Sequence, residues 1–233
     1  MRTIALAGVM GAALIGVAAA ETWNDPNGRL SFDKPSSWGI ESAGNTENQT
    51  AMLTFNASND CFMFGVVNRD TANRTANDAR NATAAMTSDA WIAAASAGQL
   101  RRDFFPNGPS APVSMSVDTS GFWPVQRAQF QGARTVFAAI QTRPGFELRA
   151  FCAPTSGNSS AAFDQILNSL GHPNDAAWQA QAGQQAAERQ AAAEAAAQQQ
   201  QQQAQQPAQQ ELDGVDDGVE RASRDPRARR RRN

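Results

Sequence analysis

The sequence has very few of the side chains that usually carry catalytic chemistry. It contains one histidine, two cysteines and a single lysine, Lys34, in 233 residues. A histidine-rich metal site is therefore excluded, and a His-based catalytic triad would have to use His172. No CxxC pair, P-loop, G-x-G-x-x-G or G-x-S-x-G pattern is present. We therefore predict no catalytic residue, no metal and no cofactor. His172, between Gly171 and Pro173, is interpreted as a contact at a helix end.

Long hydrophobic runs are also missing, except at the start of the chain. Residues 1–20 read MRTIALAGVMGAALIGVAAA, with one arginine, a short apolar stretch and small residues at the end. This pattern predicts a secretory signal peptide and a mature chain that begins at Glu21. The alternative is a membrane anchor, which the short, Gly/Ala-rich run disfavours. No cysteine follows the small residues, so a lipoprotein anchor is not expected. The protein is predicted to be periplasmic or secreted, with no transmembrane segment after signal removal.

The two cysteines, Cys61 and Cys152, are the whole thiol content of the chain. Disulfides persist in an oxidising compartment, and an even count there predicts one bridge. That bridge would close a loop of about ninety residues and contribute roughly 4–5 kcal/mol in the chain-entropy model. The alternative is two buried free thiols that behave as small hydrophobic side chains.

The composition divides the chain into one globular domain and a tail. Residues 21–173 hold nearly all aromatic and branched side chains, enough for a single core. Residues 174–210 are rich in Ala and Gln, which predicts a solvated, partly helical linker without the apolar stripe of a regular coiled coil. Residues 211–233 are first acidic and then arginine-rich, which predicts a disordered tip.

Inside the domain, short apolar segments alternate with turn residues. Strands are expected at 50–57, 61–68, 113–118, 122–130, 134–142 and 146–152. The short links make the sheet antiparallel, and Pro144-Gly145 fits a type II turn. A helical pattern lies between 71 and 98, where Thr87 or Ser88 can cap a helix that Gly98 ends. The segment 134–142 is apolar on both faces, so the sheet needs helices and some loop on both sides.

The last helix of the domain has one continuous apolar stripe. Its members are spaced at i, i+3, i+4 and i+7: Phe163, Ile166, Leu167 and Leu170. Asn158 or Ser159 is the expected N-cap, and Gly171 the expected C′ residue. The preceding strand places four apolar residues on one face, namely Phe146, Leu148, Ala150 and Cys152. We therefore interpret residues 146–170 as a segment that closes the fold.

Two motifs resemble a known family. The opening G-x-L-S-F-x-x-P-x-x-W at residues 28–38 and the closing AAFDQILNSL at residues 161–170 are similar to those of the PsbP-like superfamily, over roughly residues 27–171. The resemblance implies an α/β/α sandwich around an antiparallel sheet and a non-enzymatic role in binding or assembly. That family has no shared catalytic residues to carry over, and the Ala/Gln-rich tail with its arginine tip departs from its pattern.

Two surfaces are candidates for binding. The first is a predicted loop in which arginines adjoin aromatic rings: Arg101, Arg102, Phe104 and Phe105. The alternative is that these rings pack beneath the loop. The second is the arginine tip, whose guanidinium groups suit phosphates and carboxylates: Arg227, Arg229, Arg230, Arg231 and Arg232. A solvated tail is the alternative reading there.

These observations predict an exported, non-enzymatic binding or assembly module of the bacterial cell envelope. Its partner would be an unknown envelope protein or an anionic envelope component, and nucleic acid is not expected as a partner in the cell. Two alternatives stay open. One is a secreted hydrolase that uses scattered carboxylates, and the other is a structural envelope protein whose tail is a spacer.

Overall fold

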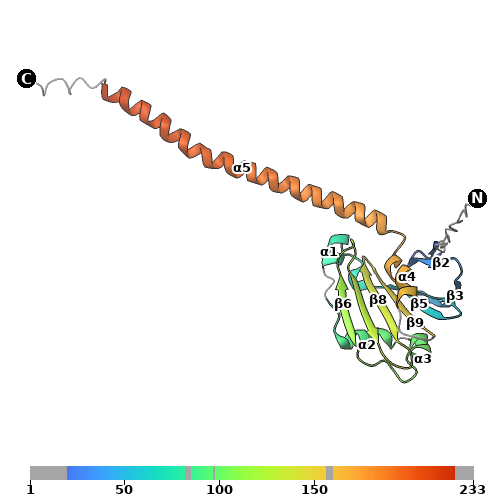
Figure 1. Cartoon of the computed structure of the whole chain (residues 1–233). Coiled ribbons are helices and arrows are strands. Elements are labelled where there is room, and N and C mark those ends of the chain that lie inside the picture. Colours follow the sequence, from blue (N-terminus) through green and yellow to red (C-terminus); the bar gives the residue numbers. More distant parts are fainter. Residues whose placement is uncertain (1–19, 82–84, 97, 156–159, 224–233) are drawn as a thin grey trace, which may run out of the picture. The chain divides into compact units, whose positions relative to one another are not determined.

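The protein is built around a seven-stranded antiparallel sheet. The structure is a computed structural model that describes residues 20–81, 85–96, 98–155 and 160–223, without the side chains of residues 98, 99, 101 and 204–223. The strand order is β3-β4-β5-β9-β8-β7-β6. In that order the strands are Gly39–Thr46, Gln49–Asn56, Asn59–Val67, Phe146–Pro154, Val136–Arg143, Val125–Phe130 and Ser114–Asp118. Two meanders, β3–β5 and β6–β9, therefore join where β5 pairs with β9, and the predicted α+β class is confirmed (Figure 1).

Three short helices follow β5, and the second and third contribute to the core on one face of the sheet. They are α1 (Ala76–Asn81), α2 (Ser88–Ala95) and α3 (Gly98–Asp103). Thr87 caps α2 as predicted, since its side chain accepts the Ala90 N–H. Gly98 does not end that helix but begins the next one, so this prediction is wrong. The α2 ring of Trp91 lies edge-on to Phe130 of β7 at 6.2 Å, in the same core cluster as Leu100.

The opposite face of the sheet is covered by a hairpin and a helix. The hairpin pairs β1 (Ala20–Asn24) with β2 (Ser31–Pro35), and the helix is α4 (Asp164–Ser169), preceded by the 3-10 turn Ala161–Phe163. The sequence predicts that helices and some loop cover this face, and the hairpin supplies part of that cover. The predicted stripe of the last helix is confirmed, because all four of its members are buried in this second cluster. The predicted caps Asn158 and Ser159 lie outside the described residues.

Gly171 has a different role from the predicted one. Its N–H donates to the Ser31 carbonyl oxygen and its own oxygen accepts the Ser31 N–H, both at 2.8 Å. It is not among the glycines with positive φ, so it is not a left-handed C′ residue. The prediction is wrong because pairing with the start of β2 keeps this segment extended.

The two cysteines form the predicted disulfide. Cys61 on β5 lies directly opposite Cys152 on β9, with 4.0 Å between the Cα atoms and a sequence separation of 91. Both are fully buried under the hairpin and α4. The bridge therefore links the two meanders at the centre of the sheet.

The turn between β8 and β9 also forms as predicted. Gly145 has a φ of 77°, the left-handed value that a type II turn requires at this position. Thr71, in the 3-10 turn η1 (Arg69–Thr71), holds this turn in place. Its hydroxyl donates to the Arg143 carbonyl oxygen and accepts the Gly145 N–H, both at 3.1 Å. The last residues of β8 are thereby fixed.

The C-terminal helix α5 runs from Asp175 to Ser223. Residues up to Gln179 belong to the globular unit, and residues from Ala180 onward form a second unit. The helix continues past residue 210, where the sequence predicts the linker to end and a disordered tip to begin. An i, i+4 hydrogen bond joins Gln190 to Glu194 at 3.0 Å. Within the described ranges, no helix combines the length and hydrophobicity that a membrane crossing needs.

Candidate functional site: a polar groove beside a buried arginine

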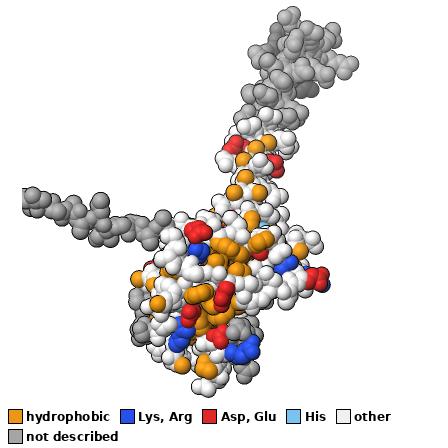
Figure 2. All heavy atoms as spheres, turned by 90° about the vertical axis from the view of Figure 1, so that its right-hand side faces the viewer, with side chains coloured by type: hydrophobic (Ala, Val, Ile, Leu, Met, Phe, Trp, Pro, Cys, Tyr) orange, Lys and Arg blue, Asp and Glu red, His pale blue; other side chains and the backbone are white. Residues whose placement is uncertain are grey.

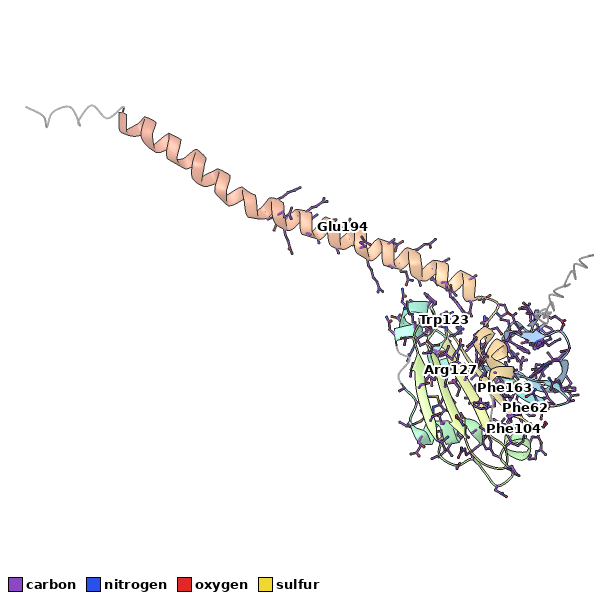
Figure 3. The ribbon with its side chains drawn as sticks, viewed as in Figure 1. Phe62, Phe104, Trp123, Arg127, Phe163 and Glu194 are labelled. Atoms are coloured by element: carbon purple, nitrogen blue, oxygen red, sulfur yellow. A yellow bond between two sulfur atoms is a disulfide. The ribbon has the colours of Figure 1, made fainter. Side chains whose placement is uncertain are left out.

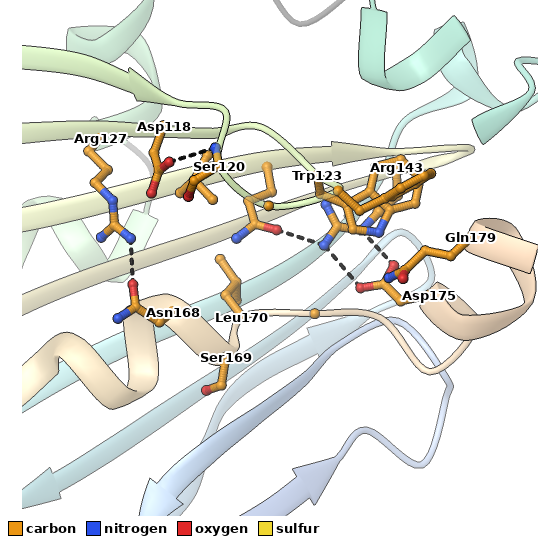
Figure 4. A pocket seen from close by; sticks show the side chains of 15 residues that line it. Asp118, Ser120, Trp123, Arg127, Arg143, Asn168, Ser169, Leu170, Asp175 and Gln179 are labelled. Atoms are coloured by element: carbon orange, nitrogen blue, oxygen red, sulfur yellow. Dashed lines mark hydrogen bonds and ion pairs between the residues drawn. The ribbon is translucent and has the colours of Figure 1, made fainter. Parts of the chain in front are cut away.

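A groove of about 520 Å³ opens on the hairpin side of the sheet. Strands β6, β7 and β8, helix α4 and the first turn of α5 contribute its walls (Figure 4). The side chains that matter for its chemistry are Asp118, Arg127, Gln141, Arg143, Asn168 and Asp175. The groove is therefore predominantly polar, and groups that are distant in the sequence meet in it.

Arg143, the last residue of β8, is only 1% exposed, and the surrounding residues satisfy its guanidinium. Its Nε donates to Asp175 Oδ1 at 2.6 Å, and Nη2 donates to Asp175 Oδ2 at 3.0 Å and to Gln141 Oε1 at 2.6 Å. Its Cζ also lies 4.3 Å from the centre of the Trp123 ring. Burial lowers the pKa of Arg143, and Asp175 opposes that shift. This arginine therefore connects the sheet to the start of α5 rather than presenting a free charge.

Arg127, on β7, is the cationic side chain that remains accessible in the groove. Its Nη2 donates to Asn168 Oδ1 on α4 at 2.6 Å, which fixes the direction of the side chain (Figure 4). In the described part of the chain, Nε and Nη1 of Arg127 have no hydrogen-bond partner. A guanidinium carries five donors in a planar fork that matches a carboxylate. Arg127 can therefore accept an anionic oxygen from a ligand.

Asp118, at the end of β6, provides the opposite charge. Hydrogen bonds from the side chain and the backbone N–H of Ser120 lower the pKa of Asp118, and the charge of Arg127 adds a smaller effect in the same direction. The Ser120 N–H lies 2.9 Å from Asp118 Oδ1. Since β6 and β7 pair Ser116 with Arg127, Asp118 stands two residues further along the same strand face. The groove thus holds one accessible cation and one anion close together.

His172 lies behind the groove and is packed as a core residue. It is 4% exposed, and its ring centre lies 4.4 Å from that of Phe146 and 4.7 Å from that of Trp178. Its Nδ1 accepts the Asn174 N–H at 3.1 Å. Burial, with a smaller contribution from Arg143, lowers the pKa of His172 to about 4, against a smaller opposing effect of Asp175. The ring is therefore neutral at pH 7.

The first predicted contact patch is not assembled as expected. Phe104 is 1% and Phe105 is 5% exposed, because both rings pack into the core beneath α3. The Phe104 ring lies 5.2 Å from Phe62, which Figure 3 shows beside it. The prediction that Phe104 and Phe105 form a contact surface is therefore wrong, and the alternative, that both rings pack beneath the loop, is correct. Arg102 is exposed, whereas the side chain of Arg101 lies outside the described part.

The predicted arginine tip lies outside the described residues, which end at residue 223. The groove residues were missed by the sequence reading, because Arg127 and Asp118 follow no motif. The only local signal was the polar interruption of otherwise apolar strands. Among the described residues, no group of three or more His, Cys, Asp or Glu side chains could hold a metal ion.

The fold is an α+β domain built on a seven-stranded antiparallel sheet. No protein-family model and no curated protein matches the sequence. The structure is similar to that of cyanobacterial PsbP (CyanoP) from Synechocystis sp. PCC 6803, with a TM-score of 0.45 and 12% identity over 70% of this chain and 98% of that one. It is also similar to a protein from Bacteroides thetaiotaomicron VPI-5482, with a TM-score of 0.41 and 15% identity over 66% of this chain. The chain spans about half of that second protein, 49% of its length. At these identities the likeness to both structures concerns the fold alone.

Proposed function

We propose that this protein is a binding and assembly module of the bacterial cell envelope, and that the polar groove holds a segment of its partner. The observation that carries the proposal is the pair of accessible opposite charges, Arg127 and Asp118, on the wall of one groove. A partner segment would place a carboxylate on Arg127 and a hydrogen-bond donor on Asp118. Small-molecule and peptide sites typically have this form, a concave surface with a few convergent polar groups.

The surroundings of the groove support binding to a preformed site. Arg143 and Asp175 hold the first turn of α5, and Asn168 on α4 orients Arg127. Since these contacts are made within the chain, little side-chain freedom remains to be lost when a ligand binds. Preorganisation of this kind increases affinity by reducing the entropic cost of association.

A non-catalytic role is supported by the way the chain uses its reactive residues. Both cysteines are paired in the disulfide, the single histidine is packed between two rings, and the buried arginine is bound to Asp175. Each of these groups has a structural partner. An envelope location is supported by the same disulfide, because such bonds persist in oxidising compartments, and by the signal-peptide pattern of residues 1–20.

The arginine-rich end of the tail is proposed as a second contact. Its five arginines, Arg227 and Arg229 to Arg232, would add attraction to an anionic membrane surface or partner. Near such a surface each arginine contributes about 1 kcal/mol. This contribution would decrease with salt, whereas binding in the groove would be less sensitive to it.

The test is affinity capture from an envelope extract with the mature chain, residues 21–233. Arg127→Ala removes the accessible cation of the groove, and Arg74→Ala is the matched control on an exposed arginine elsewhere. A third chain ends after Ala197 and lacks the arginine tip. The truncation must not be placed before Asp175, because that would leave the buried Arg143 without its ion-pair partner.

A protein that is captured by the wild type and by Arg74→Ala, but lost with Arg127→Ala, would support the groove as the binding site. Loss with the truncated chain, together with weakening by salt, would support the tail contact. If the same protein is captured by all three variants at equal yield, neither the groove nor the tail makes the contact and the proposal fails.

A further inference from the structure

Strand β6 is an outer strand of the sheet that lacks the usual protection of a sheet edge. It has a neighbour, β7, on one side only, within the described residues. Alternate residues of such a strand direct their N–H and C=O groups away from the sheet, ready to pair with another strand. Residues 113–117 carry no charge and no proline. The opposite outer strand, β3, does have protection, because it contains Glu41 and a bulge between Ser42 and Gly44.

The exposed hydrophobic surface lies at the same edge. Among the described residues, Val113 and Met115 are the large hydrophobic side chains with the greatest exposure, 57% and 50%. On the face seen in Figure 2, hydrophobic side chains are instead interspersed with charged and polar ones. Beside β6 there is a cavity of about 230 Å³, lined among others by Met86, Trp91, Met115 and Val117. An unpaired strand, exposed apolar side chains and an apolar hollow therefore coincide.

The sequence of this edge reads the same in both directions. Residues 113–117 are Val-Ser-Met-Ser-Val, with Met115 at the centre. Strand alternation puts Met115 and Val117 on one face and the two serines on the other, whereas Val113 directly precedes β6 and its N–H donates to the Gln129 carbonyl oxygen at 2.8 Å. Met115 is opposite Ala128 in the β6–β7 register, and Ala128 belongs to the same core cluster as Trp91. The apolar face of the edge therefore continues the core that α2 covers.

We propose that this edge binds a second copy of the chain, by antiparallel pairing of β6 with the β6 strand of the partner subunit about Met115. A two-fold axis through Met115, perpendicular to the sheet, keeps the corresponding faces of the two sheets on the same side of the joined sheet. Val113 then lies opposite the partner's Val117, Ser114 opposite the partner's Ser116, and Met115 opposite the partner's Met115. Two-fold contacts are self-complementary in this sense, and the palindromic strand satisfies that requirement residue by residue.

Charge and burial favour a second copy over an unrelated segment. The one charged residue of β6, Asp118, lies outside the paired region. The two Asp118 carboxylates of a dimer would be about 20 Å apart, from six residues at 3.4 Å each, so their repulsion would be largely screened. The exposed Val113 and Met115 would both be covered by like side chains, and the serines could hydrogen bond across the pair.

The test is sedimentation equilibrium of the full mature chain over a concentration series. Met115→Lys places two ammonium groups opposite each other at the centre of the pair, and we expect it to raise the dissociation constant of the dimer about tenfold or more. Ser42→Lys makes the same kind of charge addition on the other outer strand, β3, and should leave the dimer unchanged.

A charge-swap experiment separates the interface from a folding defect. Met115→Lys and Met115→Glu should each be monomeric when alone and should form a mixed dimer together, because opposite charges then face each other. The proposal is overturned if the wild-type chain stays monomeric throughout the series. It is equally overturned if the dimer survives Met115→Lys, or if Ser42→Lys weakens it to the same extent.

Discussion

Removal of the Asp175 carboxylate tests whether the buried Arg143 connects α5 to the sheet. The guanidinium is 1% exposed in the wild type; in Asp175→Ala it keeps Gln141 and the Trp123 ring as neighbours but loses both of its bonds to a counterion. The substitution also removes the acceptor of the His172 backbone N–H, whose nitrogen lies 3.1 Å from Asp175 Oδ2. The main consequence is an uncompensated buried charge.

Breaking a buried pair by removing one partner costs about 3–5 kcal/mol. The side chain of Asp175 is 20% exposed, so water can replace part of the lost interaction and the lower value applies. A loss of about 3 kcal/mol corresponds to a fall in Tm of roughly 6–12 °C for a chain of this size. Asp164→Ala is the matched control, since Asp164 is also an acid in the first turn of a helix, α4, but is exposed. It should cost about 0.3–1 kcal/mol, the range of a helix-dipole effect.

Urea denaturation followed by tryptophan fluorescence would measure both variants. The double variant Arg143→Met/Asp175→Leu provides a further check, because replacing both charges with apolar side chains should recover much of the loss. If Asp175→Ala costs no more than Asp164→Ala, or if the double variant is less stable than Asp175→Ala, the ion pair does not stabilise this part of the fold.

Three further predictions concern other parts of the domain. The pKa of His172 is 6.5 in the unfolded chain and about 4 in the folded chain. The contribution of the neutral ring to the free energy of unfolding is therefore fully present above pH 6.5. It decreases as the pH falls toward 4, by at most about 3 kcal/mol. Denaturation curves between these pH values should show that slope, and His172→Phe should flatten it. Replacing both Cys61 and Cys152 by Ala should cost about 4–5 kcal/mol, from the loop of 91 residues that the bridge closes; a urea midpoint equal to that of the oxidised wild type would contradict this. Phe104→Ala should cost about 3–5 kcal/mol as a core substitution, whereas Arg102→Ala, on the exposed side of α3, should cost about 1 kcal/mol or less. Equal thermal shifts for these last two variants would show that Phe104 is not a core residue.

Several elements could be predicted from the sequence because the signals for them are local. The period of two along 146–152 placed Phe146, Leu148 and Cys152 on one face, and in the structure Leu148 and Cys152 are buried in the α4 cluster, with Phe146 partly buried against it. The cap at Thr87 and the turn at Gly145 follow from backbone preferences of single residues. Gly98 and Gly171 were misassigned, because a glycine after a helical pattern suits a helix end, the start of another helix or an extended link equally well.

The sequence alone determined which residues are apolar and how they alternate, and it favoured a bridge between the two cysteines. Only the tertiary structure decided which distant residues meet. Asp118, Arg127, Asn168 and Asp175 come from β6, β7, α4 and α5, and the strand order and the packing of α4 bring them to one groove. Hydrophobic periodicity describes the environment of a residue along its own element, whereas contacts between elements depend on register and packing, which are properties of the whole fold.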